Sequence, residues 1–227
     1  MSDIKLILLI VLISFICTKN IVIIGDSRTC SVGYNRIGFS YTYHDDNYLA
    51  GSYIIGNKAI KYGDHKIKLI AEIGASSDTF QQPDKEVAKA VKKILSFSSS
   101  GTIVLLWLGL NDPDYSNTFN YYKSLANQYQ HLTFYAISVT GVGPYSPYFD
   151  NHKIKQFNQN LKDKIKTAGL SNLKYKSIVN NDDVTQIYNI NSKDVTFTVT
   201  ESTIDYYGIY YNRKGEREIL LAMLANI

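Results

Sequence analysis

Five apolar runs of strand length alternate along the chain with segments in which apolar residues recur every three or four positions. The runs cover residues 21–24, 67–73, 102–108, 132–139 and 173–179. Most of them are continuous, as expected for strands that are buried on both faces. This alternation is typical of a parallel sheet with helices on both sides, so we predict an α/β protein. The lysines in the fifth run predict that it forms an edge of the sheet.

The segments between the runs predict amphipathic helices, since each has an apolar stripe at helical spacing. The stripes lie in 87–95, 119–129, 154–168 and 216–225. Two regions fit this pattern less well. Residues 33–64 predict either a helix followed by a long loop or a small hairpin insertion, and residues 180–202 predict an extra short strand.

The length of 227 residues and the hydrophobic content of 45% predict one globular domain with a sizeable core. The net charge of +4 comes from dispersed lysines and acids, without a dense basic run. We therefore expect no nucleic-acid partner. No Gly-x-Gly-x-x-Gly phosphate loop follows the first apolar run, so we expect no dinucleotide cofactor, and we assign no other cofactor and no metal.

The first 18 residues have the pattern of a signal peptide, with Lys5 followed by an apolar run from Leu6 to Cys17. The run is shorter than the roughly 20 residues that span a membrane. We expect cleavage and a secreted domain of residues 19–227, while a membrane anchor or an ordinary buried segment remain alternatives. Cleavage would leave Cys30 as the only cysteine, so no internal disulfide could form.

Turn-forming and polar residues follow the apolar runs. The first run ends in Gly25-Asp26-Ser27, the second in Gly74-Ala75-Ser76-Ser77, the third in Gly109-Leu110-Asn111-Asp112 and the fourth in Thr140-Gly141-Val142-Gly143. In an open parallel sheet, ligands bind outside the carboxyl ends of the strands. The sequence therefore predicts a site where these four loops meet.

Three of these blocks, IVIIGDSRT, IGAS and LWLGLND, resemble the SGNH, or GDSL-like, hydrolase family in order and spacing. The resemblance extends over nearly all of the chain after the leader. It implies a three-layer α/β/α sandwich with a flavodoxin-like, five-stranded parallel sheet. It also implies that Ser27 is a nucleophile, and that the Gly74 N–H, the Asn111 amide and the Ser27 N–H stabilise an oxyanion. Pre-aimed amide donors of this kind stabilise a tetrahedral acyl intermediate.

A serine hydroxyl needs a base to remove its proton. The family supplies this base in a block such as Asp-Gly-Ile-His-Tyr just before the last helix. The matching stretch here is TIDYYGIYYNRKG, in which Gly208, Ile209 and Tyr211 keep the register. Tyr210 then occupies the histidine position and Tyr207 the aspartate position, so both members of the base pair are absent.

Three residues are candidates to replace the base. Asp205 lies two positions before Tyr207 and would need a rearranged loop. His152 follows the loop after the fourth run, although a polar residue near a helix start is commonly exposed to solvent. Tyr210 has an ordinary pKa of about 10 and is therefore a proton donor rather than a base at neutral pH.

Arg28 and Asp112 could each contact a substrate, but we favour structural roles for both. We expect Arg28 to pair with an acid at the start of the first helix, and Asp112 to cap the turn through Pro113. Two functions stay open: an esterase acting on acetyl or acyl esters of carbohydrates or lipids, with activity lost or impaired, and a non-catalytic module that binds a glycan or an acylated ligand.

Overall fold

The computed structural model describes residues 18–42, 51–144, 146–147, 149–188, 195–199 and 210–227. At its centre lies a seven-stranded sheet in the order β2-β4-β1-β5-β6-β7, in which β3 also pairs with β4. Five neighbouring strands are parallel: β4 (His65–Glu72), β1 (Lys19–Gly25), β5 (Ile103–Trp107), β6 (Thr133–Ile137) and β7 (Leu173–Lys176). The five expected strands and the flavodoxin-like order are confirmed, with β7 at an edge.

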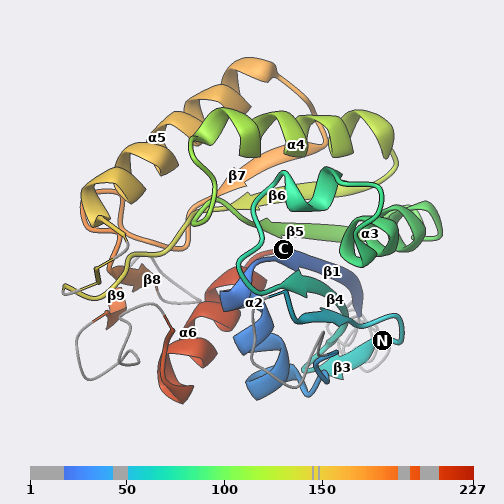
Figure 1. Ribbon diagram of the computed structural model, residues 1–227, viewed down its shortest axis with the longest axis horizontal. Coiled ribbons are helices and arrows are strands. Elements are labelled where there is room, and N and C mark those ends of the chain that lie inside the picture. Colours follow the sequence, from blue (N-terminus) through green and yellow to red (C-terminus); the bar gives the residue numbers. More distant parts are fainter. Residues whose placement is uncertain (1–17, 43–50, 145, 148, 189–194, 200–209) are drawn as a thin grey trace, which may run out of the picture.

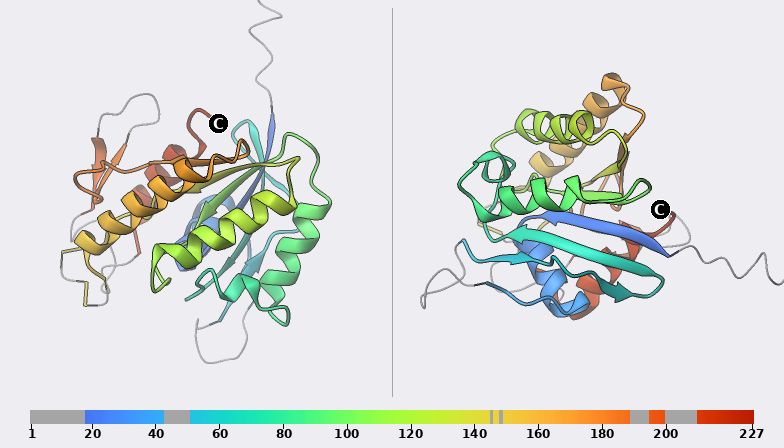
Figure 2. Two further views of the ribbon diagram at one scale, coloured as in Figure 1. Left: turned by 90° about the horizontal axis from the view of Figure 1, so that it is seen from above. Right: turned by 90° about the vertical axis from the view of Figure 1, so that its right-hand side faces the viewer.

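Helices cover both faces of the sheet, which gives three layers (Figure 1). One layer contains α3 (Glu86–Ser96), α4 (Tyr115–Gln128) and α5 (Asn151–Ala168). The other contains α2 (Ser27–Val32), its π-helical continuation η1 (Gly33–Ile37), and α6 (Arg213–Leu224). The views in Figure 2 show the same separation of the helices by the twisted sheet.

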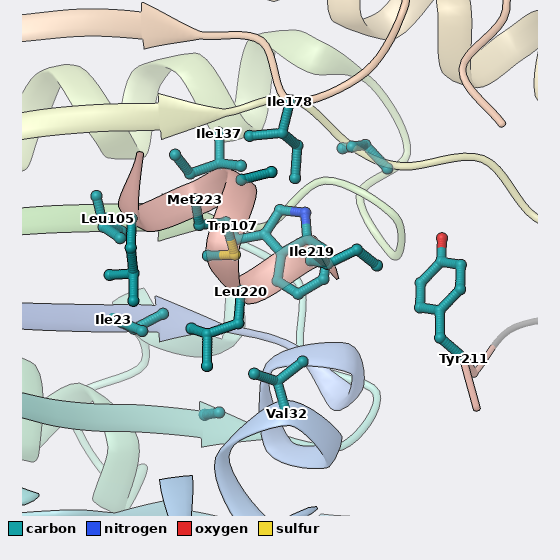
Figure 3. Close-up of a cluster of buried hydrophobic side chains, with 14 of the residues drawn as sticks. Ile23, Val32, Leu105, Trp107, Ile137, Ile178, Tyr211, Ile219, Leu220 and Met223 are labelled. Carbon is teal, nitrogen blue, oxygen red and sulfur yellow. The ribbon is translucent and has the colours of Figure 1, made fainter. Parts of the chain in front are cut away.

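Alternate residues of β1 explain why both faces are covered. Ile21 and Ile23 belong to the core beneath α2 and α6, while Val22 and Ile24 belong to the core beneath α3 and α4. Figure 3 shows Leu220 of α6 close to Ile23 of this strand. Residues 21–24 are each at most 2% exposed. A strand that is buried on both faces needs apolar side chains at every position, which explains the continuous apolar run in the sequence.

The helix starts lie at the same edge as the candidate site, and their caps come from polar residues in the loops. Asp26 caps α2, Asp114 caps α4 and Asp150 caps α5, each by accepting a hydrogen bond from an N–H of the first turn. Asn212 caps α6 in the same way. Side-chain oxygens at this position satisfy N–H groups that have no partner within the helix.

The two regions without a clear sequence pattern contain short antiparallel strands. β2 (Tyr53–Ile55) and β3 (Ile60–Tyr62) each pair antiparallel with β4, so region 33–64 combines the helical start η1 of one alternative with the added strands of the other. β8 (Gln186–Tyr188) pairs with β9 (Val195–Thr198) beside the main sheet, so the second region contains two strands rather than one. Cys30 is free and fully buried. Within the described ranges, no helix is long and apolar enough to cross a membrane.

Candidate active site

The loops after β1, β4 and β5 start at the same level of the sheet. Gly25 is in register with Ala71 of β4 and with Trp107 of β5. Ser27, Gly74 and Asn111 follow these three aligned positions by two, three and four residues. The strand order therefore brings the three loops to one edge, where ligands bind in open parallel sheets.

Ser27 is the first residue of α2 and is only 6% exposed. Asp26 precedes it and accepts a hydrogen bond from the N–H of Arg28 at 3.0 Å, which fixes the start of the helix. In the part of the chain that the structure describes, the Ser27 hydroxyl makes no hydrogen bond. Its nucleophilic role stays a prediction.

Gly74 has a φ of 78°, a left-handed conformation that glycine adopts without strain. The Asn111 amide nitrogen donates to the carbonyl of Ala75 at 3.0 Å. This bond joins the loop after β5 to the loop after β4. An amide group has two donor hydrogens, so one remains for a ligand.

The expectation that Asp112 caps the turn through Pro113 is wrong. Its carboxylate accepts hydrogen bonds from the N–H of Ser77 at 2.9 Å and from the Ser77 hydroxyl at 2.5 Å, whereas Asp114 provides the cap of α4. Burial raises the pKa of Asp112. Asp112 is thus a second link between the loops after β4 and β5.

The expected ion pair of Arg28 with an acid is also wrong, since the guanidinium binds the loop after β6. It donates to the carbonyl and hydroxyl of Thr140 at 2.6 and 2.8 Å, and to the carbonyl of Gly141 at 3.3 Å. The Tyr211 ring lies 5.3 Å from the guanidinium carbon, and its hydroxyl donates to Gly141 at 2.5 Å. Figure 3 shows Tyr211 beyond the ends of the strands.

This buried cluster of Arg28, Thr140, Gly141 and Tyr211 was missed at the level of sequence. Arg28 is 2% exposed and Tyr211 is 6% exposed. The cluster ties the residue after Ser27 to the residue after Tyr210. The sequence indicated that Thr140-Gly141 follows a strand. It did not indicate that Arg28 and Tyr211 bind there.

Asp26 is the most perturbed carboxyl group at this edge. Burial raises its pKa from 3.8 to about 6, and the nearby positive charge of Arg28 opposes the rise. Its side chain is directed to the N-terminus of α2 by the bond to Arg28. Asp26 therefore holds the helix start that carries Ser27.

The residues expected near the base position are only partly described. Asp205 and Tyr207 lie outside the described residues, and Tyr210 is half-buried just before the start of α6. His152 lies on the exposed first turn of α5, where its Nε2 is 2.9 Å from the Gln156 side-chain nitrogen. It borders a small hollow of about 230 Å³ to which Ser27 does not contribute.

The other described histidines lie at the opposite edge of the sheet. His65 begins β4, and His131, just before β6, is 3.2 Å from the carbonyl of Ser98. His44 lies outside the described residues. None of the three described histidines forms a hydrogen bond with Ser27.

An open cleft of about 1040 Å³ begins at Asn111 and runs between the starts of α4 and α5. Its walls combine aromatic rings with charged and amide groups, among them Asn111, Asp112, Tyr115, Phe149, Lys153 and Phe157. Gly109 forms part of this wall with a φ of 124°, and a Cβ there would meet the Phe157 ring at 2.4 Å. The cleft is large enough for a small-molecule ligand. Among the described residues, no group of three or more His, Cys, Asp or Glu side chains could hold a metal ion.

Solved structures match this architecture over most of the chain. A lipase/acylhydrolase from Enterococcus faecalis aligns with 92% of this chain over 94% of its own length, with a TM-score of 0.52 and 11% identity. This chain has the fold of that acylhydrolase. A Streptococcus pneumonia protein, provisionally named a platelet activating factor, is similar over 92% of this chain and 84% of its own, with a TM-score of 0.57 and 13% identity.

No family model matches the chain, and no curated protein matches it. The similarity to the solved structures therefore lies in the α/β/α fold, which agrees with the resemblance to SGNH hydrolases. Sequence identities of 11–13% carry no information on the reaction.

Proposed function

We propose that the chain is an SGNH-type ester hydrolase in which Ser27 attacks small acyl esters and in which removal of the serine proton is impaired. The Ser27 N–H, the Gly74 N–H and the Asn111 amide are the proposed oxyanion donors. The observation that carries the proposal is the hydrogen bond from Asn111 to Ala75, which links two of the three loops directly beside the large cleft.

The proposal keeps the oxyanion donors of the family but lacks its general base. Amide donors aimed at a developing oxyanion contribute about 2.7–4 kcal/mol each. Loss of the histidine from a serine triad lowers kcat by about a millionfold. The oxyanion hole and substrate binding alone still accelerate the reaction about 10³–10⁴-fold over the reaction in water. A tyrosine at 210 supplies no base at neutral pH. We therefore expect very slow turnover of simple acetyl and short-acyl esters.

A second function is a binding module that recognises a glycan or an acylated ligand without hydrolysis. It is favoured by the positions of His65, His131 and His152, none of which bonds to Ser27. The mixture of aromatic rings and amide or charged groups in the cleft suits such a ligand, since rings stack on apolar faces while the polar groups bond to hydroxyls.

The experiment restores the missing base pair by combining Tyr207→Asp with Tyr210→His. This places an acid three residues before a histidine, as in the family block. Hydrolysis of acetyl and short-acyl esters is measured for wild type, for the double variant, and for each with Ser27→Ala. We expect hydrolysis that depends on Ser27 to appear, or to rise by several orders of magnitude, only in the double variant.

The matched control combines Tyr206→Asp with Tyr210→His, which introduces the same two side chains at the wrong spacing. Equal activity of the control and the double variant would show that the spacing is irrelevant. Fast wild-type hydrolysis that is abolished by Ser27→Ala would refute the impaired base. Binding of an acetylated oligosaccharide by the wild type, with no activity in any variant, would favour the binding module.

A further inference from the structure

The sheet edge opposite the candidate site carries three lysines on one face. Ile70 of β4 packs into the core beneath α3, so Lys66 and Lys68, four and two residues earlier, lie on the same face of the strand. Lys61 of β3 stands directly opposite Lys66 in the antiparallel register. These lysines therefore extend a positive surface beyond the end of α3.

The arrangement works against the stability of the sheet. Like charges directly opposite each other on neighbouring strands are unfavourable. Within the described part of the chain, Lys61, Lys66 and Lys68 form no ion pair, and neither does Asp64 in the turn between β3 and β4. A cluster of this kind gains free energy when it binds an external anion.

An aromatic side chain stands beside the lysines. Phe97, just after α3, is 83% exposed, the most exposed large apolar side chain among the described residues. Lys66, Lys68, Phe97 and Ser99 surround a hollow of about 220 Å³, and no carboxylate lines it. Lys93 precedes Phe97 by four residues, so it lies on the same side of the helix end.

The chain also enters the domain at this edge. β1 begins at Lys19 and pairs there with His65, at the start of β4. The apolar run from Leu6 to Cys17 precedes it in the sequence. Figure 1 shows the start of β1 on the right of the molecule, while the strands point to the left, where the loops of the candidate site lie.

We propose that this edge, formed by Lys61, Lys66, Lys68, Lys93 and Phe97, docks on an anionic lipid surface. The ammonium groups pair with headgroup phosphates, and the Phe97 ring enters the interface between headgroups and acyl chains. The candidate site then faces away from the membrane, because it occupies the other end of the sheet. The inference does not depend on the reaction proposed for Ser27.

The test measures partition of the domain of residues 19–227 onto vesicles of phosphatidylcholine alone and of an equimolar mixture with phosphatidylglycerol. Each lysine near an anionic surface changes partition about fivefold. We expect wild type to prefer the anionic vesicles, with a preference that weakens as salt is added. Lys66→Glu with Lys68→Glu should lower partition by at least about 25-fold on the same scale.

The matched control is Arg213→Glu with Lys214→Glu, the same charge change in exposed residues at the start of α6. It should leave partition within about fivefold of wild type, the effect of one lysine at a surface. Phe97→Ser should weaken binding several-fold without changing its salt dependence, and circular dichroism confirms that each variant is folded.

Three outcomes would overturn the proposal. Equal binding of wild type to both vesicle types would show that the lysines do not bind the anionic headgroups. An equal loss of partition in the control variant would show that only the net charge of the protein matters, not the position of the lysines. Full displacement by soluble polyaspartate, together with no effect of Phe97→Ser, would assign the lysines to a general polyanion site instead of a membrane surface.

Discussion

Replacing Asp26 by Asn should stabilise the protein at neutral pH and leave its stability unchanged in acid. Asp26 is 3% exposed, and burial raises its pKa from 3.8 to about 6. The folded state therefore holds the Asp26 proton more tightly than the unfolded state does. Stability falls as the pH rises from about 4 to about 6 and stays lower above that range, since the buried carboxylate must then be charged.

The size of the effect follows from the shift. A rise of about two pKa units corresponds to a loss of about 3 kcal/mol in the free energy of unfolding above pH 6. The pKa of about 6 already includes the attraction to Arg28. Asparagine caps a helix about as well as aspartate, so the bond to the Arg28 N–H should survive the substitution.

The assay is urea unfolding of wild type and Asp26→Asn at pH 4 and at pH 7. We expect similar free energies of unfolding at pH 4 and a variant that is more stable by about 3 kcal/mol at pH 7. Asp150→Asn is the matched control, because it changes an exposed carboxylate that caps α5. A difference between wild type and Asp26→Asn that is the same at both pH values would refute the reasoning.

Two further predictions concern the buried arginine and the leader. Arg28→Met leaves the buried Thr140 and Gly141 carbonyls without their guanidinium donor, which costs about 1–3 kcal/mol for each group. Urea unfolding should therefore show a loss of about 2–6 kcal/mol, and a loss below about 1 kcal/mol would contradict the buried cluster. Mass spectrometry of the exported protein should find a first residue near Lys19 or Asn20, whereas retention of Met1 to Thr18 would favour an anchor.

The strands, the helices and the strand-end loops could be predicted from the sequence because they depend on local pattern. A continuous apolar run such as 21–24 fits only a strand covered on both sides, and parallel strands place their following loops at one edge. The loops that carry Ser27, Gly74 and Asn111 could therefore be assigned to one edge of the sheet, and the register of β1, β4 and β5 agrees. The same pattern gave no partner for Ser27, since Tyr207 and Tyr210 occupy the positions of the family aspartate and histidine.

The tertiary structure decided what depends on distant partners and burial. Arg28 binds Thr140, 112 residues later in the chain, and only the packing of α2 against the loop after β6 brings the two together. The high pKa of Asp26 comes from the same burial, which composition cannot predict. The lysine pair at 61 and 66 arises from the antiparallel register of β3 and β4. Local sequence specifies periodicity, whereas register and burial are properties of the whole fold, because they are set by residues far apart in the chain.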